Sequence, residues 1–250
     1  MILRVRRLGQ HFLKHQITID RFIQFAELGP NDRVFEIGTG DGRLTKELVK
    51  KCSFVLSCEL DEQLYKATYE MFRNVPNLTI MNTDALTIDI TGFDCVISSL
   101  PYYLSSKFID WFVAQEAPRA TLILQKDFYD KITSSPGERK YGTYSVLTRY
   151  CFRLTPAMIL PRDEFTPRPR VTSIMVKLDR VAKLDNAQRI IRALKLLFSF
   201  RGRTINSMNK ILMKRFTQFE PITSACDLRV EELEPEKAIE LARAFSLVMV

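Results

Sequence analysis

Residues 98–103, which read SSLPYY, combine the side chains that a protein needs to hold a flat aromatic amine. They directly follow an apolar run at 93–97 that is typical of a buried strand. Pro101 fixes its φ angle at about −65° and donates no hydrogen bond, so nearby carbonyls and the short Ser99 side chain can face one amino group. Tyr102 adds a face on which a base taken out of its stack can lie. The alternative interpretation is an ordinary turn after a buried strand.

A glycine-rich segment lies upstream, where EIGTGDG occupies residues 36–42. It follows a strand-like run and opens a helical pattern, so its glycines allow a tight turn that a ligand can approach closely. The spacing is GxGxG, and Arg43 stands where a dinucleotide-binding fingerprint has its third glycine. This spacing favours S-adenosylmethionine over a nicotinamide cofactor. A purely structural turn is the alternative.

Two acidic residues follow the next two strand-like runs. Glu59 comes near the end of the run at 54–60, and Asp84 near the end of the run at 78–85. Because ligands bind at the carboxyl ends of strands in open α/β sheets, we expect Glu59 to accept hydrogen bonds from ribose hydroxyls and Asp84 to accept one from an adenine amine. Helix capping or solvent exposure is the alternative for each residue, but signals at three successive strand ends favour a nucleotide site.

The elements that must position these residues alternate along the chain. Strand-like runs occupy 33–38, 54–60, 78–85, 93–100 and 120–125. Helical patterns occupy 42–51, 61–73 and 105–115, with Ser105 as a candidate N-cap of the last one. This alternation predicts a parallel sheet covered by helices on both faces.

The pattern changes after residue 125. Residues 126–150 contain one or two helices, and two strands at 150–160 and 173–178 are joined by a proline-rich loop, which suggests an antiparallel hairpin at the sheet edge. Seven strands with the last antiparallel form a class I (Rossmann-like) S-adenosylmethionine-dependent methyltransferase sheet, so the predicted fold class is α/β. Helical patterns at 186–200, 203–216 and 235–248 predict a small C-terminal all-helical domain. We therefore expect a catalytic domain at 1–180 and a helical RNA- or ribosome-binding domain at 181–250.

The composition of the chain limits the classes of partner and the cellular locations that we expect for it. The formal net charge of +8 over 250 residues favours a polyanionic partner. Five scattered cysteines without a CxxC pair, and only two histidines, argue against a disulfide framework or a zinc site, so we expect no metal and reduced thiols. No apolar run is long enough for a membrane helix, and the basic N-terminus does not resemble a secretory signal. We expect a cytoplasmic monomer.

Taken together, the motifs resemble the ribosomal RNA adenine dimethyltransferase family of small-subunit assembly (KsgA/Dim type), in an archaeal-like form. The similarity extends over nearly the whole chain and rests on GQHFL at 9–13, EIGTG at 36–40, TDAL at 83–86, SLPY at 99–102, FTPRPRVTS at 165–173, Phe198 with Arg201, Arg203 and Thr204, and RVEEL at 229–233. YGTYS at 141–145 resembles a family segment only loosely, because it lacks the arginine of that segment.

The resemblance implies S-adenosylmethionine-dependent N6,N6-dimethylation of adenosines in small-subunit ribosomal RNA or a pre-ribosomal small subunit. The cofactor-binding residues that it implies, together with those argued above, are Gln10, His11, Leu13, Glu36, Gly38, Gly40, Glu59, Asp84 and Ser99. The catalytic candidates are Ser99, Leu100, Pro101, Tyr102 and Phe165, the last of which would cover the second face of the base. Ser99 replaces the asparagine of the family, and its shorter hydroxyl can still accept a hydrogen bond.

Basic residues supply the expected RNA contacts. The candidates are Arg168, Arg170, Arg201, Arg203, Lys210 and Lys214, accompanied by Arg4, Arg6, Arg7, Arg162 and Arg215. For any one of them a solvated helix face is the alternative. Such contacts to phosphates position an RNA without reading its sequence, so target choice would come from RNA shape.

Three other functions fit parts of the sequence. A large-subunit rRNA adenine methyltransferase would share the motifs, but the C-terminal arginines and RVEEL favour the small subunit. A non-catalytic assembly or transcription factor is favoured only by Ser99, and the intact acidic residues and glycine loop oppose it. A small-molecule methyltransferase fits poorly with the LPYY run and the basic C-terminal part.

Overall fold

The computed structural model describes residues 10–215, 221–223 and 227–248. These residues form two compact units. The first unit joins the residues up to Phe128 with Arg153–Arg180, and the second joins Tyr129–Phe152 with the residues from Val181 onward. One division therefore falls at the expected position near Arg180. Residues 129–152, which the sequence analysis placed in the catalytic domain, group with the C-terminal helices instead.

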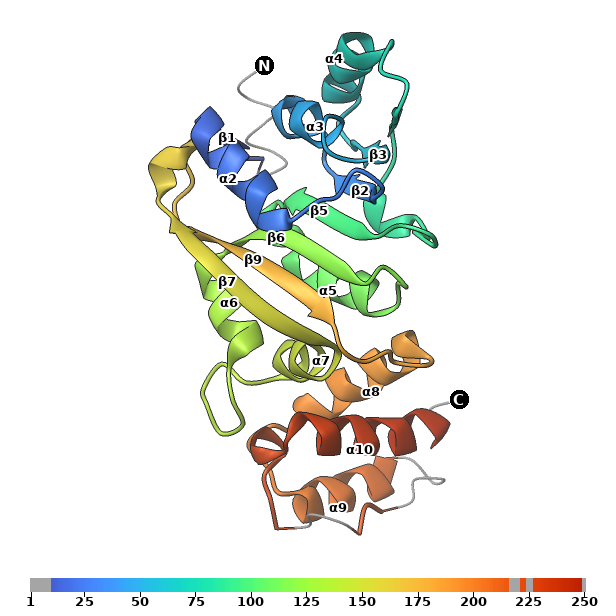
Figure 1. The fold of residues 1–250 in the computed structure, drawn as a ribbon. Helices are drawn as coiled ribbons and strands as arrows, with labels where there is room; N and C mark the ends of the chain where they lie inside the picture. The colour runs from blue at the N-terminus through green and yellow to red at the C-terminus, as the bar shows by residue number, and fades with distance from the viewer. Residues whose placement is uncertain (1–9, 216–220, 224–226, 249–250) are drawn as a thin grey trace. The chain divides into compact units, whose positions relative to one another are not determined.

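A seven-stranded sheet organises the first unit (Figure 1). Its strands, in spatial order, are β4 (Leu78–Met81), β3 (Phe54–Cys58), β2 (Arg33–Ile37), β5 (Cys95–Ser99), β6 (Arg119–Gln125), β9 (Ser173–Arg180) and β7 (Phe152–Leu160). The strands from β4 to β6 pair in parallel, and β9 pairs with β6 in the antiparallel sense. The α/β class and the seven-stranded sheet predicted from the sequence are confirmed. β3 and β4 end earlier than their apolar runs, which leaves Glu59 and Asp84 in the loops that follow, whereas Ser99 is the last residue of β5.

The helices of the first unit are α2 (Gln16–Ala26), α3 (Arg43–Leu48), α4 (Glu62–Phe72), α5 (Ser105–Val113) and the start of α6 (Lys126–Thr133). Asp61 caps α4 by accepting from the backbone N–H groups of Gln63 and Leu64. The prediction that Ser105 caps α5 is wrong. A 3₁₀ turn, η2 (Tyr102–Leu104), leads straight into α5, so the backbone is already helical at Leu104 and the Ser105 hydroxyl donates back to the Tyr102 carbonyl.

No element was predicted before residue 33, yet residues 10–26 (the N-terminal segment) contain a strand and a helix. Its short strand β1 (Phe12–Leu13) pairs with β8 (Phe165–Thr166) in an antiparallel two-stranded sheet. Leu13 and the buried side of α2, including Phe22, join the hydrophobic core of the unit. This pairing joins residues more than 150 positions apart and forms one side of the site described below.

The second unit contains α7 (Thr143–Cys151), α8 (Ala187–Phe198), α9 (Ile205–Arg215) and α10 (Pro235–Val248). The buried face of α8 carries Ile190, Leu194 and Leu197, which recur at helical spacing. Tyr141 is almost fully buried, and its hydroxyl donates to the Leu233 carbonyl at 2.7 Å. The C-terminal helices predicted from the sequence therefore pack together with a segment from the middle of the chain.

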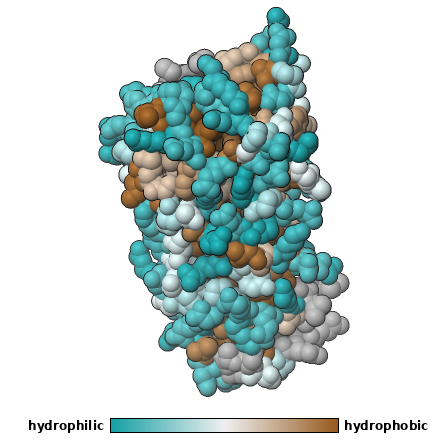
Figure 2. Space-filling model, viewed as in Figure 1, coloured by the Kyte–Doolittle hydropathy of each residue, from teal (hydrophilic) through white to brown (hydrophobic). Residues whose placement is uncertain are grey.

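On the face drawn in Figure 2 hydrophilic residues predominate, and hydrophobic residues form scattered groups. Within the part of the chain that the structure describes, no helix has the length and apolar character needed to cross a membrane. Cys52, Cys58, Cys95 and Cys151 are buried, and Cys226 lies outside the described residues.

Candidate active site

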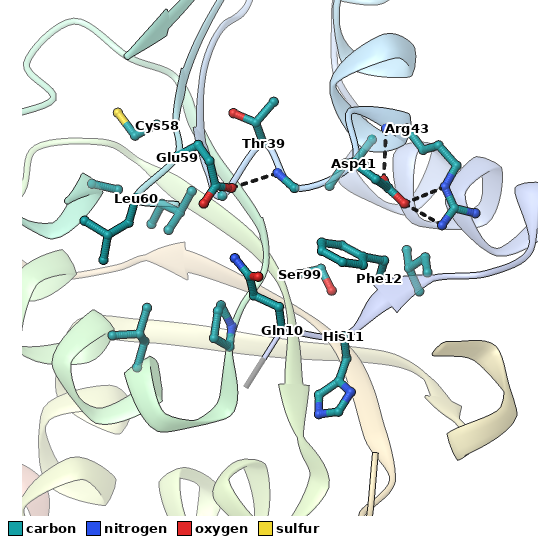
Figure 3. A pocket seen from close by; sticks show the side chains of 18 of the residues that line it. Gln10, His11, Phe12, Thr39, Asp41, Arg43, Cys58, Glu59, Leu60 and Ser99 are labelled. Atoms are coloured by element: carbon teal, nitrogen blue, oxygen red, sulfur yellow. Dashed lines mark hydrogen bonds and ion pairs between the residues drawn. The ribbon is translucent and has the colours of Figure 1, made fainter. Parts of the chain in front are cut away.

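A pocket of about 200 Å³ lies in the first unit, where β2, β3 and β5 end (Figure 3). Its lining comes from the N-terminal segment, the glycine loop after β2 and the loops after β3, β4 and β5. Among the residues predicted from the sequence, those that line it are Gln10, His11, Leu13, Gly38, Gly40, Glu59, Asp84, Ser99 and Pro101. Residues spread over some 90 positions of sequence thus meet because parallel strands end at one edge of the sheet.

Two glycines of the glycine loop, Gly38 and Gly40, have different surroundings. Gly38 has φ +84°, and a Cβ added there would meet no atom within 4 Å, so the backbone is open toward the pocket. Gly40 has φ +60°, and a Cβ there would come within 2.9 Å of the Phe12 ring. A side chain is therefore excluded from Gly40 by the N-terminal segment, and a side chain at Gly38 would intrude on ligand space.

Glu59 joins the loop after β3 to the glycine loop. Its Oε2 accepts from the Gly40 N–H at 2.9 Å, drawn as a dashed line in Figure 3, and its Oε1 accepts from the Asp61 N–H at 2.8 Å. The residue is nearly buried, and this burial raises the pKa of its carboxyl group. Each oxygen of a carboxylate has a second lone pair, so Glu59 can still accept hydrogen bonds from a ligand.

Asp84 serves as a cap and also lines the pocket. Its Oδ1 accepts from the Leu86 N–H at 3.0 Å at the start of a 3₁₀ turn, η1 (Ala85–Thr87). The side chain is exposed at the pocket wall, where Leu60 also lies with 56% of its surface exposed. An exposed apolar side chain beside a carboxylate suits a flat ring that carries an amine. Helix capping and ligand binding are therefore compatible here.

The alternation of side chains along β5 selects which serine faces the pocket. Ser98 is fully buried and its hydroxyl donates to the Ile37 carbonyl at 2.8 Å. Ser99 points the other way, is half-buried and lines the pocket (Figure 3). Within the described residues no hydrogen bond holds the Ser99 hydroxyl, which leaves it available as an acceptor for a bound amine.

Tyr102 lies beside the pocket and is held at two points. Its hydroxyl shares a 2.7 Å hydrogen bond with the Ser173 hydroxyl at the start of β9. Its ring stacks against the His11 imidazole, with ring centroids 5.6 Å apart and an interplanar angle of 29°. Burial raises the pKa of the phenol. Leu100 is buried, and its N–H donates to the Ile123 carbonyl at 3.3 Å.

Four predicted site residues do not line the pocket, namely Glu36, Leu100, Tyr102 and Phe165. Glu36 is fully buried, where its Oε2 accepts from the Thr45 hydroxyl at 2.7 Å, and burial raises its pKa to about 8. Phe165 is 4% exposed and packs in the core cluster with Leu13 and Phe22. The pairing of β1 with β8 turns the Phe165 ring into the core, so the structure does not present it to a base.

The pocket also contains residues that the sequence analysis did not single out. Phe12, Thr39, Leu60, Tyr103 and Lys107 all line it. Leu60 and Thr39 directly follow predicted positions, so their place at a strand end was a signal that could have identified them. Phe12 and Lys107 depend on the pairing of distant segments and on the direction of α5, which local sequence patterns do not give.

The predicted RNA-binding residues have different environments. Arg170, Arg203, Lys210 and Lys214 are exposed, and Arg168 is exposed but pairs with Asp163 at 3.0 Å. Arg201 is turned toward the protein, where it bonds Glu231 at 2.9 and 2.8 Å and the carbonyls of Arg139 and Glu138 at 2.8 and 3.3 Å. Arg4, Arg6 and Arg7 lie outside the described residues, as does the side chain of Arg215.

Known proteins share both the sequence and the fold. A ribosomal RNA small subunit methyltransferase A of Clostridium botulinum (strain Loch Maree / Type A3) is 31% identical over 245 residues, which cover 95% of this chain and 85% of the relative. A probable ribosomal RNA small subunit methyltransferase A of Methanococcus maripaludis (strain C6) is 32% identical over 247 residues, 93% of this chain and 94% of the relative.

Solved structures agree on the fold. A dimethyladenosine transferase from Plasmodium falciparum superposes with a TM-score of 0.77 at 21% identity, covering 96% of this chain and 99% of that one. The 23S rRNA methyltransferase ErmE gives a TM-score of 0.67 at 27% identity, covering 93% and 98%. A family model described as ribosomal RNA adenine dimethylase matches residues 4–245. The chain that folds into this pocket and sheet therefore belongs to the ribosomal RNA adenine dimethylase family.

Proposed function

We propose that this protein transfers methyl groups from S-adenosylmethionine to the N6 atoms of adenosines in small-subunit ribosomal RNA, giving N6,N6-dimethyladenosine during ribosome biogenesis. The observation that carries the proposal is the position of Ser99 and Pro101. Both lie on the wall of a pocket whose other walls suit an adenosyl group, in a chain that belongs to the ribosomal RNA adenine dimethylase family.

The residues of the pocket fit this cofactor. The open backbone at Gly38 leaves room for a ligand, Glu59 offers acceptors for ribose hydroxyls, and Asp84 with Leu60 offers an acceptor and an apolar surface for adenine. The acidic side chains also suit a ligand with cationic groups. When bound, S-adenosylmethionine supplies a methyl group activated by its positively charged sulfur.

The protein contributes mainly positioning. An exocyclic adenine amine is a poor nucleophile because its lone pair is delocalised into the ring, and it needs acceptors that draw its hydrogens out of the ring plane. The Ser99 hydroxyl and the Leu100 carbonyl are the proposed acceptors, and Tyr102 provides the stacking face for the base. Holding the amine in line with the methyl donor then accounts for most of the rate enhancement.

The RNA contacts are proposed on charge and exposure. Arg170, Arg203, Lys210 and Lys214 present cations to solvent, and such residues bind phosphates whatever the sequence. Arg201 is the weakest candidate of the predicted set, because its guanidinium already has internal partners. That the protein is a monomer and acts in the cytoplasm remain predictions, which sedimentation and cell fractionation would test.

The direct test is methyl transfer from labelled S-adenosylmethionine to undermethylated small ribosomal subunits, followed by mass spectrometry of the nucleosides. We expect N6,N6-dimethyladenosine. A parallel reaction with large-subunit RNA tests the alternative that this protein methylates 23S rRNA, as the name of ErmE states for that protein. A Ser99→Ala variant is expected to lose most of the activity and Ser99→Asn to retain it. Tight cofactor binding without methylated adenine in either RNA would contradict the proposal and favour a non-catalytic assembly factor.

A further inference from the structure

Tyr102 is fixed by two segments that lie far from it in sequence. At one end its hydroxyl meets the hydroxyl of Ser173 on β9, and on one face its ring meets His11 of the N-terminal segment. A tyrosine held at only one of these points could rotate about its side-chain bonds. Held at both points, its ring has one orientation, and the His11 contact determines which face is covered.

His11 is itself pinned in place. Its Nδ1 lies 2.6 Å from the Pro167 carbonyl oxygen, and because a carbonyl can only accept, Nδ1 carries the proton and donates. The same part of the chain is tied down again by the β1–β8 pairing and by a 2.7 Å hydrogen bond from the Lys14 N–H to the Glu164 carbonyl. The imidazole is therefore held by the loop that follows β7.

The direction of the His11 side chain separates it from the cofactor loop. In Figure 3 the Phe12 ring points toward the glycine loop, which agrees with its close approach to Gly40, and the His11 imidazole points to the opposite side. His11 lines the same pocket, and its ring stacks against Tyr102.

The spacing of the two rings limits where a base can stack. The centroids are 5.6 Å apart, which is a normal distance for a stacked aromatic pair. A base inserted between them would need two stacking spacings of roughly 3.4 Å each, or about 6.8 Å in total. A target base therefore cannot lie between His11 and Tyr102 in this arrangement, and it must use the other face of Tyr102.

We propose that His11 is a positioning residue for the target base: its imidazole, anchored to the Pro167 carbonyl, backs the Tyr102 ring and sets the angle at which the free face of that ring receives adenine. This role rests on the proposed function, and it differs from the cofactor-binding role expected from the sequence. Because Phe165 is buried in the core, the aromatic partner of Tyr102 is His11.

Three substitutions separate the two contacts of His11. His11→Phe keeps a ring against Tyr102 and removes the hydrogen bond to Pro167, His11→Asn keeps an N–H donor at a similar position and removes the ring, and His11→Ala removes both. We expect kcat for methyl transfer to fall about tenfold in His11→Asn and His11→Ala, since small errors of alignment are costly, and by less than about threefold in His11→Phe. The Kd for S-adenosylhomocysteine is expected to change less than about threefold in all three, since the imidazole is directed at Tyr102 and points away from the glycine loop.

A readout that does not depend on turnover accompanies the kinetics. Target RNA with fluorescent 2-aminopurine at the methylated position reports how the base stacks, and we expect less quenching with His11→Ala than with the wild type or His11→Phe. His15→Ala is the matched control, because His15 is exposed and makes no side-chain cap bond to α2.

The outcomes separate the two proposals. A wild type that methylates no RNA defeats the proposed function itself. An active wild type with unchanged kcat in His11→Ala, or with His11→Phe as impaired as His11→Ala, overturns the role of the ring. An equal loss of S-adenosylhomocysteine affinity and kcat would return His11 to the cofactor site.

Discussion

The pocket of the first unit and the basic residues of the second were both predicted from sequence patterns. The predicted pocket residues lie together in the structure, whereas the basic residues have different environments. Glu59 and Asp84 come from the loops after β3 and β4, Ser99 ends β5, and all three still meet at one pocket. Arg201 and Arg203 are two positions apart, yet the first bonds Glu231 and two backbone carbonyls while the second is exposed. Two arginines that are close in sequence therefore have different environments, whereas residues at the ends of separate strands share one pocket.

The difference has a physical cause. A polar residue at the carboxyl end of a parallel strand has its place fixed by the register of the whole sheet, so its role follows from topology. A cation on a helix or loop has a long, flexible side chain that can reach solvent, a phosphate or an internal carboxylate. Charge therefore indicates a class of partner, whereas a strand end indicates a position.

The largest effect is expected at Glu59. Glu59→Ala removes the proposed acceptor of two ribose hydrogen bonds, which are worth about 3 kcal/mol for bonds to a charged group, so the Kd for S-adenosylhomocysteine should rise roughly 100-fold. Isothermal titration calorimetry measures it. Asp61→Ala is the control, since it removes the cap of α4 and no pocket residue. An unchanged Kd in Glu59→Ala would mean that this strand end does not bind the ligand.

Tyr102 tests the substrate side of the same pocket. Tyr102→Ala removes a stacking face worth roughly 1–3 kcal/mol, so kcat/KM for methyl transfer should fall about 30-fold with little change in cofactor affinity. Tyr102→Phe keeps the ring, loses the bond to Ser173, and should lose much less activity. Equal rates for Tyr102→Ala and the wild type would remove Tyr102 from the base site.

Arg201 tests whether the second unit contains a structural arginine or an RNA contact. Arg201→Ala leaves Glu231 and two carbonyls without their partner, and we expect a loss of about 2 kcal/mol in the free energy of unfolding, measured with urea. Arg203→Ala, which removes an exposed arginine, should change stability little. Weaker RNA binding at unchanged stability in Arg201→Ala would restore the interpretation made from sequence.

Glu36, near the end of β2, is expected to make the free energy of unfolding depend on pH. Burial raises its pKa from the ordinary 4.5 to about 8, so between these values the folded protein holds a proton that the unfolded chain releases. The contribution of the Glu36 proton to the free energy of unfolding should therefore be fully present below the lower pKa and fall as pH rises toward the upper one, by at most about 1.4 kcal/mol per pH unit. Glu36→Gln cannot titrate and should show a flatter profile in urea unfolding. Parallel profiles would contradict this.

The smallest effect is expected from the exposed lysines of α9. The double variant Lys210→Ala, Lys214→Ala should weaken RNA binding about fivefold at low salt and reduce the slope of log K against log salt by roughly 1 to 2, since each phosphate contact releases a counterion. Lys50→Ala with Lys66→Ala removes the same charge from ion pairs of the first unit and is the control. An identical salt slope in both double variants would show that α9 does not touch RNA.

The sequence by itself determined the α/β class, the seven-stranded sheet and the acidic and serine positions around the pocket. These features depend on hydrophobic periodicity and on polar residues at strand ends, and both are local signals that survive without knowledge of distant contacts. The family motifs added the N-terminal segment as a part of the pocket, and Gln10, His11 and Leu13 do line it.

Only the tertiary structure decided which side chains face inward. The β1–β8 pairing buries Phe165, brings Phe12 onto the glycine loop and sets His11 against Tyr102. In the second unit, the tertiary structure packs residues 129–152 with the C-terminal helices and pairs Arg201 with Glu231. Each of these features depends on contacts between residues far apart in the chain. The free energy of burial and hydrogen bonding at such contacts depends on the whole fold and not on neighbouring residues in the sequence.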